Sequence, residues 1–542
     1  MSVNKFSLFI NQHPWISLGG CLIMLFGFQL LNVIYGFDLN DTGFHLVAYE
    51  NVFSAPGCVA YNFMYYLTNI VGGTLMCIFP NLGVLGFRIV GALLVLLTLV
   101  IIFATLRNTI PVIHILLGSI LVVVGYVKLP YAFNNAILSC CLYAVSIVFL
   151  YKGLCRKNKL LVILSGLIVG LNIFTRIPNI LGVGLVLIIL LYKKYYLKVN
   201  GIDWINAFCF LIGVSMGVLI VLGIMLRMGH AEIFLNSLLA VHSMAGDEGS
   251  HNLLWMLKIH FAFYLSAIIP LLVFYALIHI EKCVGNKGNI YIMIAFYLIS
   301  VLSIALYVYE TPWVYVVIWG FFASGCIICI LNNRNQLGIF AILALYMLII
   351  EIYGSDSGIN HGSLPALLAA PIASMQLLDR KKVVYVLTFV LAVSWQVIRK
   401  GNFQDSGPIY QKSEIINNFE TKGVFTTKEK ACAINTTLKE IKPYISTSDT
   451  LICFPSAPMV NYLTHTRPAG GSCQPGFSGF IMPIEGTPKL LFNKVSFSSD
   501  GWQQMYKIND PYAYDIKLFI TMHRYRKVYE NDCFILFVPP IS

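Results

Sequence analysis

The chain has 542 residues, of which 58% are hydrophobic and 11% are charged, and its mean hydropathy is +0.78. This composition excludes a soluble globular protein and indicates a polytopic membrane protein. The net charge of +12 does not indicate nucleic-acid binding, because the Lys and Arg residues stand in short clusters between apolar runs.

Apolar runs long enough to cross a bilayer begin at Pro14 and recur as far as about Ile398. They predict about thirteen transmembrane helices, at residues 14–35, 83–106, 109–128, 131–151, 160–174, 178–192, 205–227, 259–280, 290–309, 312–331, 337–353, 363–379 and 383–398. The basic clusters fall on alternate loops, which the positive-inside rule assigns to the cytoplasm. With an odd number of spans, this topology predicts a multi-pass protein of the inner or plasma membrane whose C-terminal segment lies outside the cytoplasm.

The first outer loop, residues 36–82, is acidic at its start. Its opening stretch, GFDLNDTGFHLVAYENVF, holds Asp38, Asp41 and Glu50 and contains no Lys or Arg. A carboxylate in such a place can face water, cap a helix or take part in catalysis, and Asp41 could cap the helix that begins there. The apolar stretch that follows is broken by two glycines and a proline, so it predicts interfacial helices and no further span.

A second polar feature interrupts the apolar run that starts at Leu161. The sequence TRIPN holds Arg176 and Pro178 in the middle of this run, and both flanks of the run are basic. We therefore predict a helical hairpin that enters from the cytoplasm and turns near the outer surface at this break. A lone guanidinium at that depth requires an anionic partner or access to the interface.

Further polar groups are predicted on the outer side in the stretch GSDSGINHG. It contains Asp356 and His361, which are candidate substrate-binding residues. The spans themselves show no series of charged residues such as an ion or proton relay would need. No metal-ligand spacing is present, so no cofactor is predicted and a divalent metal is not indicated.

The composition changes at Arg399, which predicts two domains, a membrane domain at 1–398 and an α/β domain outside the cytoplasm at 399–542. In the second domain we expect helices in KACAINTTLKEIKPYI and PMVNYLTHTRPAGG, and strands in DTLICFPS, KLFITMH and CFILFVPP, forming a parallel or mixed sheet. This domain contains four cysteines, Cys432, Cys453, Cys473 and Cys533. They could form disulfides in an oxidising compartment, and the sequence does not determine which of them pair.

Taken together, these motifs resemble the GT-C superfamily of membrane glycosyltransferases, which includes protein O-mannosyltransferases and lipid A aminoarabinose transferases. The stretches that carry the resemblance are DLNDTGFHL directly after the first span, YENVF, GLNIFTRIPN, and the C-terminal DTLICFPS and VNYLTHTRP. Asn40 and Asp41 stand where that family often has two adjacent acids, so Asp38 or Asp41 would serve alone. The resemblance implies a polyprenyl-phosphate-linked sugar donor and a lipid, glycan or protein acceptor.

Such a transferase needs a base for the acceptor hydroxyl and a cation for the departing phosphate. We assign Asp41 as the base and Arg176 as the phosphate-binding residue, with inversion at the anomeric carbon because no second carboxylate offers itself as nucleophile. Asp38 and His45 could orient the base or bind the sugar, although His45 could equally be structural, and Glu50 is a further candidate for substrate binding. The alternatives are a transporter, a flippase-like assembly protein without transferase activity, or a ligase of preassembled glycans.

Overall fold

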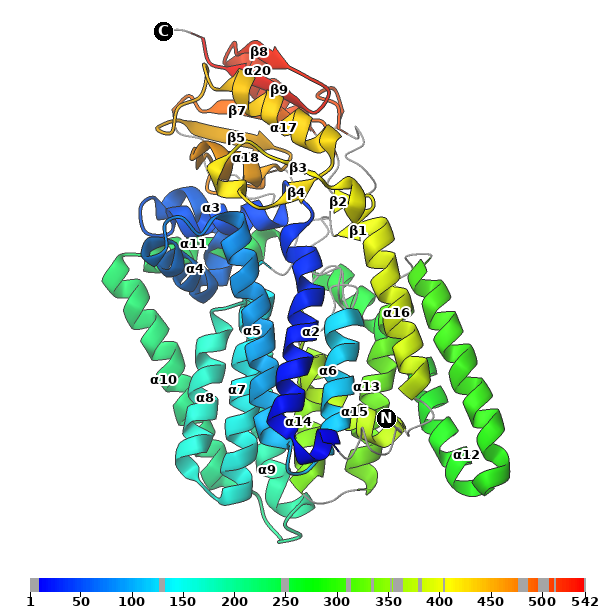
Figure 1. The fold of residues 1–542 in the computed structure, drawn as a ribbon. Helices are drawn as coiled ribbons and strands as arrows, with labels where there is room; N and C mark the ends of the chain where they lie inside the picture. Colours follow the sequence, from blue (N-terminus) through cyan, green and yellow to red (C-terminus); the bar gives the residue numbers. More distant parts are fainter. Residues whose placement is uncertain are drawn as a thin grey trace.

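The computed structural model describes residues 9–125, 132–244, 253–308, 313–332, 336–350, 353, 364–378, 383–402, 405–475, 486–495, 506–510 and 513–540. A bundle of long apolar helices forms the larger part of the molecule, and a small domain with a β-sheet lies at one end of the bundle (Figure 1). The sequence prediction of a helical membrane protein with a C-terminal α/β domain is therefore confirmed.

Each predicted span coincides with a helix. The helices are α2 (Pro14–Ile34), α5 (Gly83–Leu106), α6 (Val112–Gly125), α7 (Asn135–Arg156), α8 (Lys159–Ile173), α9 (Leu185–Tyr195), α10 (Trp204–Met228), α12 (Leu253–Val308), α13 (Trp313–Asn332), α14 (Gln336–Ile350), α15 (Ala366–Leu377) and α16 (Val383–Lys400). One helix, α12, covers two of the predicted spans. Among the described residues, seven helices are long and apolar enough to cross a membrane. The predicted number of thirteen crossings stays a prediction.

The predicted break in the hairpin is present. Helix α8 ends at Ile173, the short 3-10 segment η2 (Ile177–Gly184) follows, and α9 continues from it. Arg176 precedes η2 in an extended conformation, with φ −160°. Pro178 lies in the first turn of η2, where its missing N–H group costs no hydrogen bond.

The first outer loop folds into three short elements at the end of the bundle that faces the small domain. They are α3 (Asp41–Asn51), η1 (Pro56–Tyr65) and α4 (Tyr66–Ile78), and α11 (Ala231–Met244) lies beside them (Figure 1). None of the four is among the candidate spans of the described chain. Short helices thus form in this loop, and their position in the membrane interface stays a prediction.

The C-terminal domain is built on a five-stranded mixed sheet with the order β6-β5-β7-β9-β8. Strand β5 (Thr450–Phe454) is parallel to β6 (Arg467–Pro468) and β7 (Lys489–Asn493), while β9 (Phe534–Val538) runs antiparallel to β7 and β8 (Arg526–Glu530). Two short pairs precede it, β1 (Gly401–Asn402) with β2 (Asp405–Ser406) and β3 (Glu414–Ile415) with β4 (Phe425–Thr426). The predicted helices form as α17 (Lys428–Ile441) and α18 (Pro458–Thr464).

One predicted strand is wrong. The stretch KLFITMH belongs to helix α20 (Tyr514–Met522). Ile516 is buried, and Phe519 and Ile520 pack with it against one apolar cluster of the sheet. Their spacing of three and four residues is helical, and this periodicity decides the structure over the strand preference of the β-branched residues.

Candidate active site

Asp38 is buried where the first span passes into the outer loop, with 3% of its surface exposed. Its carboxylate accepts hydrogen bonds from the Thr42 backbone N–H at 2.9 Å and from the Thr42 hydroxyl at 2.5 Å. Arg88 of α5 lies 3.6 Å from the same carboxylate and donates to the Gly36 carbonyl at 2.7 Å. Asp38 thus caps the first turn of α3 and neutralises a buried cation.

The outer loop itself contains no Lys or Arg. The cation comes instead from the next span, because Arg88 occupies the second turn of α5 and reaches back to the loop.

Asp41 is the first residue of α3, and its side chain is partly buried. It does not occupy the capping position, which is held by Asn40, and the capping hydrogen bond to Thr42 is made by Asp38. The positive end of the helix dipole stabilises a carboxylate at this place. Asp41 therefore lies at the start of a helix whose capping is supplied by another acid.

The C-terminal domain packs directly against this helix start. The Asn40 side-chain oxygen accepts hydrogen bonds from the Ser456 hydroxyl at 2.7 Å and from the Gln474 side-chain amide. The Met459 backbone N–H donates to the Leu39 carbonyl at 3.0 Å. Gly43 faces the Met459 backbone so closely that a Cβ atom would collide with it. The Asp41 turn is therefore held between the membrane domain and α18.

A second buried carboxylate fixes the same junction. Asp405 is fully buried and accepts from the Phe37 backbone N–H at 2.7 Å and from the Thr426 hydroxyl at 2.8 Å. Two buried lysines, Lys412 and Lys430, pair with it. Burial lowers the pKa of Lys412 to about 8, although the Asp405 charge opposes this shift.

Glu50, at the far end of α3, is joined to the C-terminal domain as well. One of its carboxylate oxygens lies 2.6 Å from the Nδ1 atom of His465, the residue that follows α18. The Nε2 atom of His465 is 3.9 Å from Glu420, whose other oxygen accepts from the Tyr462 hydroxyl at 2.5 Å. The hydrogen bond to Glu50 raises the pKa of His465 above its ordinary value.

His45 lies on α3 between Asp41 and Glu50, and its side chain is surrounded by aromatic rings. Its ring is 5.2 Å from Phe44, 6.1 Å from Tyr49 and 6.2 Å from Tyr65, between ring centroids. This environment lowers the pKa of His45 to about 4, so the imidazole is neutral at physiological pH. The Nδ1 atom is buried and has no hydrogen-bond partner in the described chain.

Arg176 is also buried, with 8% of its surface exposed, and its guanidinium donates to the Tyr353 carbonyl at 2.9 Å. The ring of Tyr353 lies 4.8 Å from the ring of His260, which belongs to α12 and is 2% exposed. Both ring nitrogens of His260 lack a hydrogen-bond partner within the described chain. Buried polar atoms are rarely left in this state, so Arg176 and His260 together can receive an anionic oxygen.

Backbone hydrogen bonds connect the outer loop to the hairpin break that carries Arg176. At the start of α4 the Leu67 N–H donates to the Phe174 carbonyl at 2.8 Å, and the Thr68 hydroxyl donates to the Thr175 carbonyl at 3.3 Å. The hairpin break is thus bound to α4, whose Gly72 packs against Tyr49 of α3, the helix that carries Asp41. Asp356 and His361, the other two candidate residues, lie outside the described residues.

Several residues of this site were missed in the sequence. Arg88, His260 and His465 stand as isolated polar residues in apolar or unremarkable stretches, and Asp405, Lys412 and Lys430 belong to a segment of ordinary composition. Only Arg88 and His260 carried a usable signal, since a charged or titratable side chain within a span is costly. In the part of the chain that the structure describes, no three His, Cys, Asp or Glu side chains gather as a metal ion would require.

No protein-family model matches the sequence, and no curated protein matches it significantly. Among solved structures, the chain is similar to ArnT from Cupriavidus metallidurans bound to undecaprenyl phosphate, with 10% identity, a TM-score of 0.46, and coverage of 98% of this chain and 99% of that one. It is also similar to the Archaeoglobus fulgidus oligosaccharyltransferase in complex with Zn and sulfate, with 11% identity, a TM-score of 0.49, and coverage of 95% and 79%. Both proteins belong to the GT-C superfamily that the sequence motifs resemble. At this identity no residue role passes from them to this chain.

Proposed function

We propose that this protein is an integral-membrane glycosyltransferase that moves a sugar from a polyprenyl-phosphate donor to an acceptor hydroxyl at the membrane face covered by the C-terminal domain. The observation that carries the proposal is that two acids at the start of α3, Asp38 and Asp41, have different contacts. Asp38 supplies the cap and binds Arg88, while Asp41 lies on the same turn, partly buried, under the C-terminal domain.

In the proposed reaction Asp41 accepts the proton of the acceptor hydroxyl as its oxygen attacks the anomeric carbon of the donor. The bond between the anomeric carbon and the phosphate oxygen breaks, and the polyprenyl phosphate leaves with its negative charge. A single displacement of this kind inverts the anomeric centre.

The leaving phosphate is assigned to the hairpin break. Arg176 donates to the Tyr353 carbonyl, and the buried imidazole of His260, beside the Tyr353 ring, has an N–H group that can donate to a phosphate oxygen. Charge that develops on the phosphate during the displacement is stabilised by donors that are already in place. Glu50 and His45 remain candidate sugar-binding residues, and neither is needed for the proton transfer.

The decisive experiment measures release of polyprenyl phosphate by the purified protein. A panel of synthetic polyprenyl-phosphate monosaccharides is incubated with an envelope glycolipid extract as acceptor, with and without Asp41→Asn. Asparagine keeps the size of the side chain and loses a helix-dipole interaction of only about 0.3–1 kcal/mol, so the melting temperature should fall little. Turnover should fall by roughly 10² to 10⁴, the usual contribution of a positioned base.

Asp38→Asn is the matched comparison on the same turn. It weakens the cap of α3 and leaves Arg88 buried without its carboxylate, so its main effect should be a lower melting temperature. Near wild-type turnover by a well-folded Asp41→Asn protein would exclude Asp41 as the base.

A further inference from the structure

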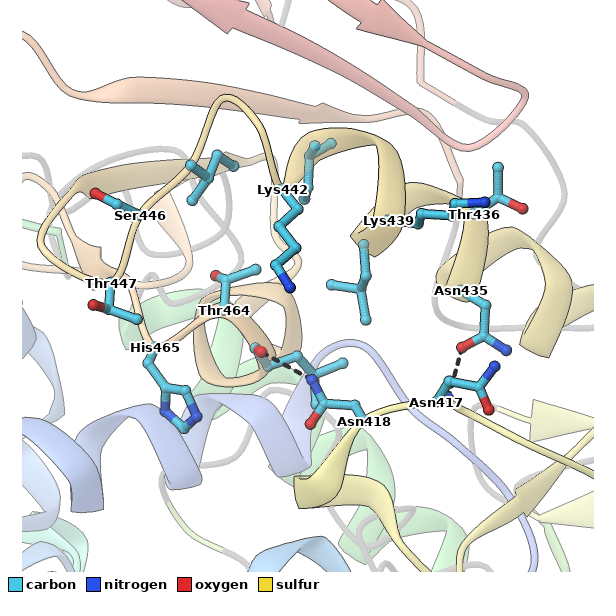
Figure 2. A pocket seen from close by; sticks show the side chains of 14 residues that line it. Asn417, Asn418, Asn435, Thr436, Lys439, Lys442, Ser446, Thr447, Thr464 and His465 are labelled. Atoms are coloured by element: carbon cyan, nitrogen blue, oxygen red, sulfur yellow. Dashed lines mark hydrogen bonds between the residues drawn. The ribbon is translucent and has the colours of Figure 1, made fainter.

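A cavity with polar and apolar lining residues lies within the C-terminal domain, apart from the Asp41 and Arg176 sites. Its volume is about 710 Å³, within the range of roughly 300–1,000 Å³ typical of small-ligand pockets. The cavity is bounded by the segment before η5 (Phe419–Thr421), by α17, by the turn that follows α17, and by the end of α18 (Figure 2).

Part of the polar lining is used to build the cavity. The Asn418 amide donates to the Leu463 carbonyl at 3.0 Å, and its oxygen accepts from the Glu420 N–H at 2.9 Å. Asn435 accepts from the Asn417 backbone N–H at 2.7 Å. These bonds hold the walls in place and leave the two amides with little capacity for a ligand.

A second group of lining side chains takes no part in holding the walls of the cavity. Lys439, Lys442 and Thr447, together with the side-chain amide of Asn417, make no hydrogen bond or ion pair within the described chain. In Figure 2 the Lys442 side chain runs from the end of α17 toward the middle of the ring of lining residues. All four residues are exposed, so two ammonium groups, an amide and a hydroxyl are accessible to a ligand from solution.

The charges around the cavity favour an anion. Lys439 and Lys442 are three residues apart on one helix, where like charges repel, and no Asp or Glu lines the cavity. His465 closes the side nearest α3, and its two neighbouring acids, Glu50 and Glu420, are occupied by it and by Tyr462. The dipole of α17 accounts for lysines at its C-terminal end, but it does not account for the neutral hydrogen-bonding groups that face the same space.

We infer that this cavity binds an acidic saccharide. A sugar carboxylate would pair with Lys442, whose side chain runs toward the middle of the cavity, Lys439 would add positive charge at its edge, and ring hydroxyls would bond to Asn417 and Thr447. The apolar side chains between them, Leu438, Ile441 and Leu463, would contact the face of the sugar ring. This binding requires no residue of the proposed transfer reaction.

The test is calorimetric titration of the full-length protein in detergent with trigalacturonate, an acidic trisaccharide, and with maltotriose as its neutral counterpart. We expect trigalacturonate to bind and maltotriose not to bind. The double variant Lys439→Gln and Lys442→Gln should weaken binding at least about 10-fold, because it removes a charge-assisted hydrogen bond and a second positive charge. Lys422→Gln, an exposed lysine of the same domain that does not line the cavity, should leave the affinity unchanged.

Asn417→Ala provides a second variant that leaves the charge in place, and it should weaken binding about 3- to 10-fold, as the loss of one hydrogen bond does. Raising NaCl to 0.5 M should also weaken binding of trigalacturonate, since exposed charges are screened. Equal binding of maltotriose, unchanged affinity in the double variant, or inorganic phosphate binding as tightly as trigalacturonate would each overturn the inference.

Discussion

At the scale of single residues, neighbouring acids on one turn have different environments. Asp38 accepts hydrogen bonds from Thr42 and pairs with Arg88, whereas Asp41, three residues later, is the first residue of α3 and is partly buried. The contacts of Asp38 hold the start of α3 and the buried Arg88 in place. Our proposal therefore gives Asp38 a structural role and Asp41 the proton transfer.

Arg176 gives a prediction at the same scale. Arg176→Gln should reduce affinity for a polyprenyl-phosphate sugar by at least about 10-fold, because a charge-assisted hydrogen bond contributes about 1.5–3 kcal/mol. Arg176→Lys keeps the charge without the planar fork and should be intermediate. Binding is measured by titration of the purified protein with the donor lipid, and Arg227→Gln, an exposed arginine at the end of α10, serves as the control.

If Arg176→Gln binds the donor as tightly as the wild type while melting at a lower temperature, Arg176 is a structural anchor of the hairpin. Arg176 would then contribute to folding, through contacts such as its hydrogen bond to the Tyr353 carbonyl, and would not contribute to donor binding.

At the scale of elements, the apolar runs and the prolines and glycines that interrupt them predicted the positions of most helices. The apolar runs coincide with helices, and Pro178 interrupts one of these runs at the place where η2 begins. The strand assigned to KLFITMH failed because a short apolar run fits a buried strand as well as a helix. The partners of Asp38, Glu50 and Asp405 could not be predicted, because they come from elements whose relative placement no local pattern encodes.

The contact between α3 and the end of α18 predicts a pH-dependent stability. Glu50 raises the pKa of His465 in the folded protein, so the folded state binds this proton more tightly than the unfolded chain does. The resulting stabilisation is fully present below the ordinary His value of 6.5 and is lost as the pH rises through the raised value. Glu420 faces the same imidazole and acts in the same direction.

Melting temperatures of the wild type and of Glu50→Gln should therefore differ most at about pH 5.5 and converge toward about pH 8.5. Glu414→Gln, an exposed acid on β3, controls for general effects of charge. A difference between wild type and Glu50→Gln that stays constant over this range would show that His465 does not titrate at the interface.

At the scale of the whole molecule, the two domains meet through buried charges. Asp405 joins the backbone of the first outer loop to two lysines of the C-terminal domain, and Arg88 and Asp38 lie on the membrane side of the same junction. Each of the five charged groups is less than 9% exposed. Removing any one of these charged groups should lower the stability of the protein, because it leaves another charge buried without a partner.

Asp405→Asn should accordingly cost about 3–5 kcal/mol of stability, the usual effect of breaking a buried ion pair. The melting temperature should fall, and limited proteolysis should cut the segment between α16 and α17 more rapidly than in the wild type. Asp515→Asn, an exposed acid at the start of α20, is the control. Proteolysis of Asp405→Asn at the wild-type rate would contradict a role of this cluster in joining the domains.

The hydrogen bonds of the first outer loop also determine when that loop can be completed. The partner of Phe37 lies 368 residues further along the chain, and the Ser456 partner of Asn40 lies 416 residues further. At a synthesis rate of about 5–20 residues per second, the loop waits roughly 20 to 80 s before those partners exist. A ribosome-bound chain that has already inserted its first span therefore carries Asp41 on a loop that does not yet contact the C-terminal domain. These contacts can form only after the last quarter of the chain has been synthesised.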